Sequence, residues 1–427
     1  MADHTNETRT TLSNVLKYRY EGPLRDITPE RSKTLNLLQK GLGKSGWGGK
    51  SITDALQFNY FGSASAVAEG GTLPASTPVN NNITVIPMKY NYFSVSVTGI
   101  AMATTRDTAS SFGEAWAMQV FNKMKSHRQH MNRQSLGDGN GYLAQVAETP
   151  SLSGSDYTVK LDNAFGISGM NNSVVNGHTF ISTNMLVDFY SGSTCRDVGA
   201  CKITSWTRGA FPSTEATAVF VSGDLDSVAN GDYMYTEQGY GNECMGLRGL
   251  IDDDTVASTV QSLSALTYAE WRSQMGYGST EGTAEPLTSL RMGTLETDIE
   301  QAGGNTRFIL TSPAVWLTYG DMCNQENLHV NVTTMDNGWK KAEYNGIPIY
   351  KDPVMWDEMF WVDTDTIKMY EVAPEGWLDL DGDIIKQTAQ KDVWEAYWGW
   401  YMNFGTVDRS KNGKLVDITV RANTVAR

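Results

Sequence analysis

The sequence has few of the residues that anchor proteins in membranes or stabilise secreted domains. Its 427 residues include only four cysteines, too few for a disulfide framework, so free thiols are the plainest interpretation. Cys195 and Cys201 lie close together, but no histidine or further cysteine beside them could complete a zinc site. No apolar run approaches the length of a membrane span, and the first residues, MADHTNETRT, are polar. We therefore expect neither a disulfide-rich secreted protein nor a membrane protein.

Residue patterns that carry out catalysis are also scarce. The five histidines are scattered, and the chain has no Gly-x-Ser-x-Gly turn. His127 and His130 would share one helix face, but no carboxylate completes a metal-binding spacing, which favours surface or interface histidines. The densest acidic run, Asp252–Asp254, is explained more simply by a solvated turn or helix start than by a metal site. We expect no catalytic, metal-binding or cofactor-binding residue.

The stretch KGLGKSGWGG, Lys40 to Gly49, superficially resembles a phosphate-binding loop. Such a loop needs a glycine five residues before the glycine of Gly-Lys-Ser, and Leu38 stands there instead. The preceding SKTLNLLQK has helical spacing, and the glycines after Ser45 would break the helix that should hold the phosphate. We interpret the glycine run as a flexible joint. Two further stretches, Leu136–Tyr142 and Asp379–Asp383, fail the calcium-loop pattern and are expected to be turns.

The chain is acidic, but its charge is unevenly distributed. The formal net charge of −14 argues against a protein that wraps nucleic acid by bulk attraction. The first 50 residues carry nine Lys/Arg and five Asp/Glu, or +4, which leaves −18 on the remaining 377. This asymmetry fits a basic arm that lies on an acidic surface of another molecule, although a solvated tail would have the same composition.

Residues 51–98 predict a long two-stranded ribbon with a loose tip. The stretch VAEGGTLPASTPVNNN is rich in small and polar residues and is flanked by strand-like runs. Because an isolated ribbon is marginally stable in water, we expect another subunit to support it. A helix is predicted next, from Phe112 to Ser135, since apolar residues recur there at helical spacing after a capping box formed by Ser111 and Glu114.

The second half of the chain mixes strands and helices. Short strand-like runs separated by Gly, Asn, Asp and Ser predict a compact β subdomain between residues 150 and about 240. Beyond Met245, the patterns predict helices over Thr267–Met275 and Pro286–Ala302, then the strand RFILT and a helix start at Ser312-Pro313. No glycine-rich nucleotide fingerprint follows any of these strands.

The C-terminal segment is predicted to return to strands. In WEAYWGWYMNFG the even positions from Trp394 to Phe404 are all apolar, which favours a strand, although a helical stripe through Tyr397 and Trp398 stays open. We expect this aromatic face in the core or in a subunit contact rather than in a sugar-stacking platform. Asn412-Gly413 offers a hairpin turn into KLVDITV.

In this order, the parts resemble the major capsid proteins of tailed bacteriophages with the Hong Kong 97 fold. The resemblance covers most of the chain and rests on distributed motifs rather than a single signature. GPLRDITPERSKTLNLLQKG is similar to the N-terminal arm of these proteins, AVAEGGTLP to the tip of their E-loop, and RQSLGDGNGYLA to the exit of their spine helix. GLRGLID, ILTSPAVW and YNGIPIYKDP are similar to recurring parts of their A-domain.

The resemblance implies an α+β fold of the Hong Kong 97 type. It places an N-terminal arm at 1–50, an E-loop at 51–98, a P-domain with a long spine helix at 99–149, a β-rich inserted subdomain at 150–240, an A-domain at 241–364 and the return strands of the P-domain at 365–427. The implied function is that of a non-enzymatic major capsid protein, which self-assembles into the icosahedral shell around a bacteriophage genome. The arm and the E-loop would then grip neighbouring subunits.

The implied partners are many copies of this chain, arranged as hexamers and pentamers, with a portal and packaged double-stranded DNA. Because only about 50 residues precede the E-loop, a separate scaffolding protein is expected, and a decoration protein is a further candidate. The implied location is the virion, and the host cytoplasm during assembly. The predicted interface residues lie in the arm, at the ribbon tip and on the aromatic strand: Leu35, Trp47, Glu69, Gly70, Gly71, Pro74, Trp394 and Trp398.

Two alternatives stay open at this stage. An encapsulin, the shell protein of a bacterial compartment, would have the same fold, although the β-rich insertion and the phage-like arm favour a phage protein. A β-rich binding protein or hydrolase that uses the regions of Asp253 or Asp381 belongs to a different class, and the missing catalytic motifs weigh against it.

Overall fold

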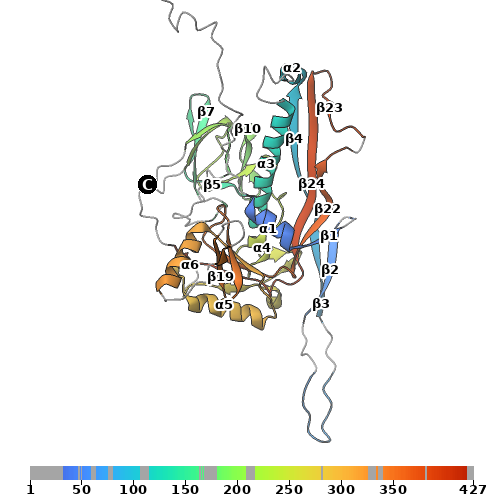
Figure 1. The fold of residues 1–427 in the computed structure, drawn as a ribbon, viewed down its shortest axis with the longest axis vertical. Coiled ribbons are helices and arrows are strands. Elements are labelled where there is room, and N and C mark those ends of the chain that lie inside the picture. Colours follow the sequence, from blue (N-terminus) through green and yellow to red (C-terminus); the bar gives the residue numbers. More distant parts are fainter. Residues whose placement is uncertain are drawn as a thin grey trace, which may run out of the picture.

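The computed structural model describes residues 32–420 except 47–48, 50, 59–63, 76–79, 106–114, 163–164, 166, 168–179, 208–216, 280–281, 326–332, 335–339 and 380–381. A long sheet runs along one side of the molecule, and a long helix lies against it (Figure 1). A β-barrel and an α/β layer lie on the helix side, and a two-stranded ribbon projects beyond the lower end of the sheet in this view.

The long sheet is built around the aromatic C-terminal strand, β24. This strand pairs antiparallel with β22 and β4, and β1 joins β22 in parallel. Trp400, Met402 and Phe404 are at most 2% exposed, so the even-numbered residues face the core. The predicted strand is thus confirmed, and the helical alternative is wrong. The strands are β1 (Gly43–Gly46), β4 (Lys89–Thr98), β22 (Ile367–Trp377), β23 (Lys386–Gln387) and β24 (Val393–Thr406).

The helix predicted at 112–135 is confirmed as α3, Ala115–Leu136. Its end is buried, from Met131 to Leu136, whereas the described residues of the first half are exposed or half-buried. His127 packs against Phe93 of β4, which fixes the side of α3 that faces the sheet. The predicted capping box, Ser111 and Glu114, lies outside the described residues. A short helix, α2 (Gly99–Thr104), precedes α3, and the Thr98 hydroxyl accepts a hydrogen bond from its Ala101 amide.

Strands between residues 144 and 236 form a closed β-barrel. They pair in the order β10-β11-β7-β5-β12-β8, and β8 pairs again with β10 to close the ring. Closure leaves few exposed strand edges, and alternate residues such as Val159, Phe189 and Ile203 fill the interior. The strands are β5 (Ala144–Val146), β7 (Asp156–Asp162), β8 (Leu186–Ser191), β10 (Val198–Thr207), β11 (Thr217–Asp224) and β12 (Tyr233–Thr236), with β6 (Ser151–Ser153) and β9 (Thr194–Cys195) attached.

A seven-stranded sheet and two helices form the α/β layer. Helix α6 (Pro313–Gln325) begins where predicted, because the Ser312 hydroxyl accepts a hydrogen bond from the Val315 amide at 3.2 Å and proline suits the first helical position. Helix α5 (Ser289–Gln301) confirms the prediction for 286–302. The strands are β15 (Gln274–Gly276), β17 (Phe308–Thr311), β18 (Thr333–Thr334), β19 (Lys340–Tyr344), β20 (Ile347–Lys351), β21 (Met359–Val362) and β25 (Gly413–Leu415).

The projecting ribbon consists of β2 (Ser51–Phe58) and β3 (Asn80–Pro87), paired antiparallel along their whole length. The Val85 amide donates to the Gln261 carbonyl at 2.9 Å, and Phe58, at the far end of β2, packs near Trp271, so the paired part of the ribbon lies against the body. The smaller elements near the ribbon and elsewhere are α4 (Leu247–Leu250), β13 (Thr259–Val260), β14 (Leu263–Ser264), the 3₁₀ helix η2 (Ala269–Trp271), β16 (Glu285–Pro286) and β26 (Ile418–Thr419).

The end of the predicted arm lies on its own chain. Helix α1 (Lys33–Gly41) buries Leu35 and Leu38, which are at most 1% exposed, in the main core. The Gly-Lys-Ser run that follows lies in strand β1, which confirms that it is not a phosphate loop. The expectation of a flexible joint is wrong for residues 43–46, because they form a strand that pairs in register with β22.

Two local predictions are wrong. A helix was predicted over Thr267–Met275, but this stretch contains η2 and then β15, because Gln274 pairs with Gly413 in the α/β layer. Asn412-Gly413 does not make the predicted hairpin, since β24 and β25 belong to different sheets. In both cases a strand partner far away in the sequence outweighs local propensity.

Candidate functional site

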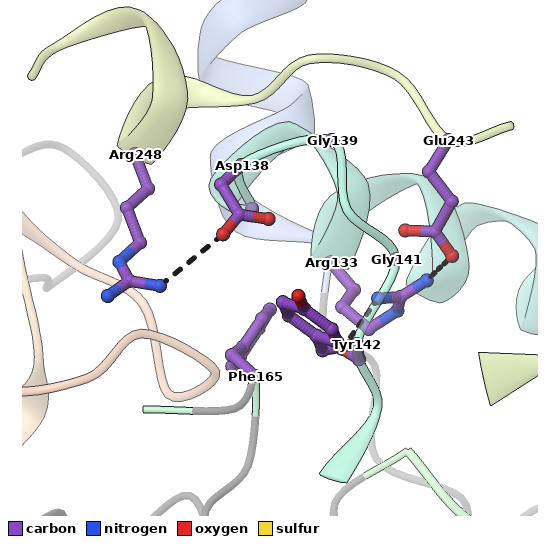
Figure 2. A pocket seen from close by; sticks show the side chains of 9 residues that line it. Arg133, Asp138, Gly139, Gly141, Tyr142, Phe165, Glu243 and Arg248 are labelled. Atoms are coloured by element: carbon purple, nitrogen blue, oxygen red, sulfur yellow. Dashed lines mark hydrogen bonds and ion pairs between the residues drawn. The ribbon is translucent and has the colours of Figure 1, made fainter. Parts of the chain in front are cut away.

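A small pocket lies where the end of α3 meets the loops that lead into and out of the barrel (Figure 2). Arg133, on the last turn of α3, is 2% exposed, forms an ion pair with Glu243 and donates to the Tyr142 carbonyl at 3.2 Å. Arg248 of α4 forms an ion pair with Asp138 at 3.6 Å. Figure 2 shows these two pairs on either side of Tyr142.

The pocket is too small for a substrate. Its cavity volume is about 10 Å³, roughly the space of one water molecule. Burial raises the pKa of Glu243, and the Arg133 charge opposes this effect. Because both arginines already have a carboxylate partner, the arrangement is suited to fixing the barrel onto α3, and we interpret the pocket as a structural joint.

The histidines of α3 do not form a metal site. The described residues contain no group of three or more His, Cys, Asp and Glu side chains that could hold a metal ion. Burial lowers the pKa of His127 to about 4, helped by the charge of Arg128, so this imidazole is neutral in the folded chain. His130 lies 3.9 Å from Glu243 at the edge of the joint.

The cysteines offer no activated nucleophile. All four are free, and only Cys195 is exposed. Burial raises the pKa of Cys195 and raises that of Cys244 to about 12, whereas a reactive cysteine has a lowered pKa. In the part of the chain that the structure describes, no helix is both long and apolar enough to cross a membrane.

The acidic run at 252–254 is not the solvated turn expected from the sequence. Asp252 is 0% exposed and forms an ion pair at 2.8 Å with Lys414, which is 1% exposed. Burial alone would raise the pKa of Asp252, but Lys414 and the amide donors of Val256 and Ala257 bring this pKa below its ordinary value. Arg409 lies nearby and donates to two carbonyls at the end of α4. The pair joins β25 to the loop after α4.

A second buried carboxylate holds the arm helix in place. Asp352 accepts hydrogen bonds from the Thr34 amide at 3.0 Å, the Thr34 hydroxyl at 2.6 Å and the Asn132 side chain at 3.2 Å. Asn132, on α3, also accepts a hydrogen bond from the Leu35 amide at 2.8 Å. One polar cluster thus connects α1, α3 and the α/β layer.

The predicted interface residues lie in three separate places. Leu35 is buried within its own chain, and Trp47 lies outside the described residues. Trp394 and Trp398 are half-buried on β24, where Trp398 stacks on Phe93.

The residues predicted at the ribbon tip, Glu69, Gly70, Gly71 and Pro74, are all exposed. The tip makes a tight turn, because the Gly71 amide donates to the Ala68 carbonyl at 2.9 Å and Gly70 has φ +77°. This positive φ favours glycine. The tip lies far from the aromatic strand in Figure 1, so the structure does not bring the two predicted surfaces together within one chain.

The sequence interpretation missed an exposed tyrosine face on the long sheet. Tyr90 and Tyr92 of β4 are 58% and 53% exposed and point away from α3, since their neighbours on the strand face it. Both contact Tyr401 edge-on, at centroid distances of 5.4 and 5.7 Å. A Cβ at Gly399 would lie 3.3 Å from the rings of Tyr92 and Tyr401, so glycine lets them lie over the strand. The odd-numbered aromatic residues of WEAYWGWYMNFG, Tyr397 and Tyr401, were the signal in the sequence that could have revealed this face.

Comparisons with known proteins relate this fold to capsids. No family model and no curated protein matches the sequence. The capsid asymmetric unit of cyanophage A-1(L) superimposes with a TM-score of 0.56 at 13% identity, covering 97% of this chain and 100% of that chain. The chain therefore shares its fold with that capsid subunit.

Weaker similarities extend to a phage and to an encapsulin. The structure of Mycobacterium phage Bobi has a TM-score of 0.47 at 9% identity, over 96% of this chain and 99% of that chain. The holo-SrpI encapsulin complex from Synechococcus elongatus PCC 7942 has a TM-score of 0.45 at 8% identity, over 99% of both chains. These scores are too low to support an assignment by themselves.

Proposed function

We propose that this chain is a tailed-bacteriophage major capsid protein of the Hong Kong 97 type, which self-assembles into the icosahedral shell around the phage genome. The observation that carries the proposal is the similarity to a cyanophage capsid subunit along 97% of the chain. The proposed role is structural, and the pocket at the end of α3 agrees with it, because this pocket holds two ion pairs and a cavity of only about 10 Å³.

The ribbon supports a function in assembly. It projects from the body with an exposed tip on which Leu73 is 80% exposed and Val67 is 42% exposed. Its two paired strands are packed on the body, where Thr84 and Ile86 are 1% exposed, so the projecting part is the exposed tip, residues 64–75. We assign the ribbon to the E-loop predicted at 51–98, although the end of that range, β4, lies in the long sheet. We propose that the tip residues Glu69–Pro74 contact a neighbouring subunit.

The tyrosine face is the best candidate for the surface that receives this tip. Tyr90, Tyr92 and Tyr397 are 45–58% exposed on one face of a rigid sheet, and exposed aromatic patches of this kind are enriched in protein interfaces. Leu73 and Pro74 of a neighbouring copy would bury apolar surface against these rings. Such a contact joins two different surfaces, and contacts of this kind generate a ring of subunits when the rotation between neighbours closes. Trp394 and Trp398 stay interface predictions.

The remaining assignments follow from the same proposal. The barrel corresponds to the inserted subdomain predicted at 150–240, the α/β layer to the A-domain at 241–364, and α3 with the long sheet to the P-domain. The proposed partners are a scaffolding protein, a portal, double-stranded DNA and a decoration protein, with the virion as location and the host cytoplasm during assembly. The encapsulin alternative differs in its cargo, so nucleic acid in the native particle would favour the phage protein.

Electron microscopy and mass measurement of the purified assembly test this function. We expect closed particles from the wild-type chain and impaired closure for Leu73→Asp. Since burying a leucine contributes about 1.5–3 kcal/mol, each lost contact should raise the concentration needed for assembly about tenfold or more. Leu152→Asp, on an exposed leucine of the barrel (61%), is the matched control and should assemble normally. A stable monomer at high concentration would refute the proposal.

A further inference from the structure

Strand β4 forms an open edge of the long sheet. All ten of its residues pair antiparallel with β24, and no strand of the described residues pairs with its opposite side. An unpaired edge presents a row of backbone N–H and C=O groups that can bind another extended segment. The edge of β4 is therefore a candidate binding surface that consists of backbone groups rather than side chains.

The pairing with β24 shows which residues of β4 direct their backbone groups to this edge. The Gly99 amide donates to the Asp392 carbonyl at 3.1 Å, and this pair continues the β4–β24 register by one residue. Hydrogen-bonded and non-hydrogen-bonded pairs alternate along an antiparallel ladder, so the odd-numbered residues of β4 bond to β24. The even-numbered residues direct their N–H and C=O groups to the open edge: Tyr90, Tyr92, Ser94 and Ser96.

The neighbouring strand agrees with this alternation. On β24, the carbonyl of the odd-numbered Tyr397 accepts a hydrogen bond from the Leu378 amide at 2.9 Å, on the side away from β4. The even-numbered residues of β24 are then the ones that bond to β4. Among the described residues, the backbone groups of Tyr90, Tyr92 and Ser94 at the open edge have no hydrogen-bond partner.

The open edge of β4 is long and lacks the usual protection against pairing. The other terminal strands of the sheet, β1 and β23, have only four and two residues, and very short edge strands offer little to pair with. β4 has ten residues, no proline and one charged side chain, Lys89, which donates to the Gly241 carbonyl on the body at 2.6 Å. Charge and proline therefore do not block the edge from Tyr90 onward.

The edge is also held in place before any partner binds. Val95 and Val97 are at most 7% exposed, and Phe93 packs against His127 of α3. The even-numbered side chains on the other face are exposed. Because a preformed strand loses little conformational freedom when a partner adds to it, binding at this edge has a low ordering cost.

The ribbon tip has extended arms that lack a strand partner. Residues 64–68 and 72–75 form the two arms beside the turn (Figure 1), and neither arm is a strand in the described part of the chain. The turn itself is closed by the hydrogen bond from Gly71 to Ala68. The arm at 64–68, ASAVA, contains no charge and no proline, whereas Pro74 interrupts the other arm. The arm at 64–68 is therefore the better strand to add to an edge.

We propose that residues 64–68 of a neighbouring copy add as a further strand to the open edge of β4. The inference rests on the proposed function, which brings the tip of one copy to the tyrosine face of the next. The edge and that face are continuous, because Tyr90 and Tyr92 contribute both exposed rings and outward backbone groups. Main-chain hydrogen bonds then supply binding, while the rings cover the apolar side chains of the tip.

Amide hydrogen exchange with single-residue resolution tests the proposal on the wild-type chain, before and after assembly. We expect the amides of Tyr92, Ser94 and Ser96 to exchange rapidly in the unassembled chain and at least about tenfold more slowly in the particle. The Phe93 and Val95 amides should be protected in both states. Residues 64–68 should gain protection on assembly. Contact with the tyrosine rings alone would not produce this alternation along β4.

A pair of substitutions at one position tests the same edge by assembly. Ser94→Pro removes an outward N–H without removing a hydrogen bond to β24, and edge strands tolerate proline at such positions. Loss of one backbone hydrogen bond per contact should raise the concentration needed for assembly about tenfold. Ser94→Val keeps the N–H and suits a strand, so this matched control should assemble like the wild type. If Ser94→Pro does not fold, the exchange pattern of the wild-type chain decides.

The outcomes distinguish the inference from the proposed function. Particles in which the even-numbered amides of β4 exchange as fast as in the unassembled chain would refute the inference alone. Protection of the β4 edge without protection of residues 64–68 would show that another strand, such as β4 of a second copy, occupies it, and the assigned occupant would be wrong. A wild-type chain that forms no particles would refute the proposed function, on which the inference depends.

Discussion

The buried ion pair between Asp252 and Lys414 allows a quantitative test of what holds the core together. The carboxylate accepts hydrogen bonds from three backbone amides and one threonine hydroxyl in the following turn, besides its contact with the Lys414 ammonium. The two residues stand 162 positions apart in the sequence, so the pair connects the loop after α4 to β25. Both side chains are at most 1% exposed.

Replacing Lys414 and replacing Asp252 should lower the free energy of unfolding by different amounts. Breaking a buried ion pair costs about 3–5 kcal/mol. Because Lys414→Met leaves the Asp252 carboxylate with its uncharged hydrogen-bond donors, we expect a loss of about 3 kcal/mol. Asp252→Leu leaves a buried ammonium near Arg409 and also deprives three amides of their acceptor, at about 1–3 kcal/mol each. We therefore expect a loss above about 6 kcal/mol for Asp252→Leu.

Urea unfolding of the unassembled chain, followed by tryptophan fluorescence, would measure both losses. Lys411→Met is the matched control, because Lys411 pairs with Asp408 at 3.4 Å on the surface, where both side chains are about one third exposed; its cost should stay below about 1 kcal/mol. The reasoning fails if Lys414→Met is as mild as this control, or if it is more harmful than Asp252→Leu.

Two further predictions concern the interior of the chain. In the folded chain the pKa of His127 is about 4, against about 6.5 when unfolded. Because the unfolded chain binds the proton more tightly, the free energy of unfolding is unaffected by this group above pH 6.5. It falls by about 3 kcal/mol as the pH is lowered from 6.5 to 4. His127→Phe should flatten the fall of the unfolding free energy in that window, and an unchanged pH profile would contradict the assignment. Leu38→Ala should lower the unfolding free energy by about 2–5 kcal/mol, and a loss below about 1 kcal/mol would show that α1 does not belong to the core.

Much of the local structure could be predicted from the sequence. α3, α5, β24 and the start of α6 were predicted because their signals are periodicity and capping, which involve residues a few positions apart. The strand-like runs at 150–240 were also found, but closure of the barrel was not, since it depends on β8 pairing with both β10 and β12. The candidate surfaces were less predictable. The ribbon tip stood out by composition, whereas the tyrosine face became visible only once β4 and β24 had been placed side by side.

The sequence by itself determined the order of elements, the polarity of most of their faces and the absence of familiar catalytic motifs. Only the tertiary structure decided that Asp252 is buried, that the segment before Gly276 is a strand, that α1 packs in its own chain's core and that β1 pairs with β22. The physical reason is distance along the chain: these outcomes depend on Lys414, Gly413 and Asp352, partners more than a hundred residues away. A periodic pattern reveals which side of an element is apolar, but what covers that side is fixed only when the chain folds.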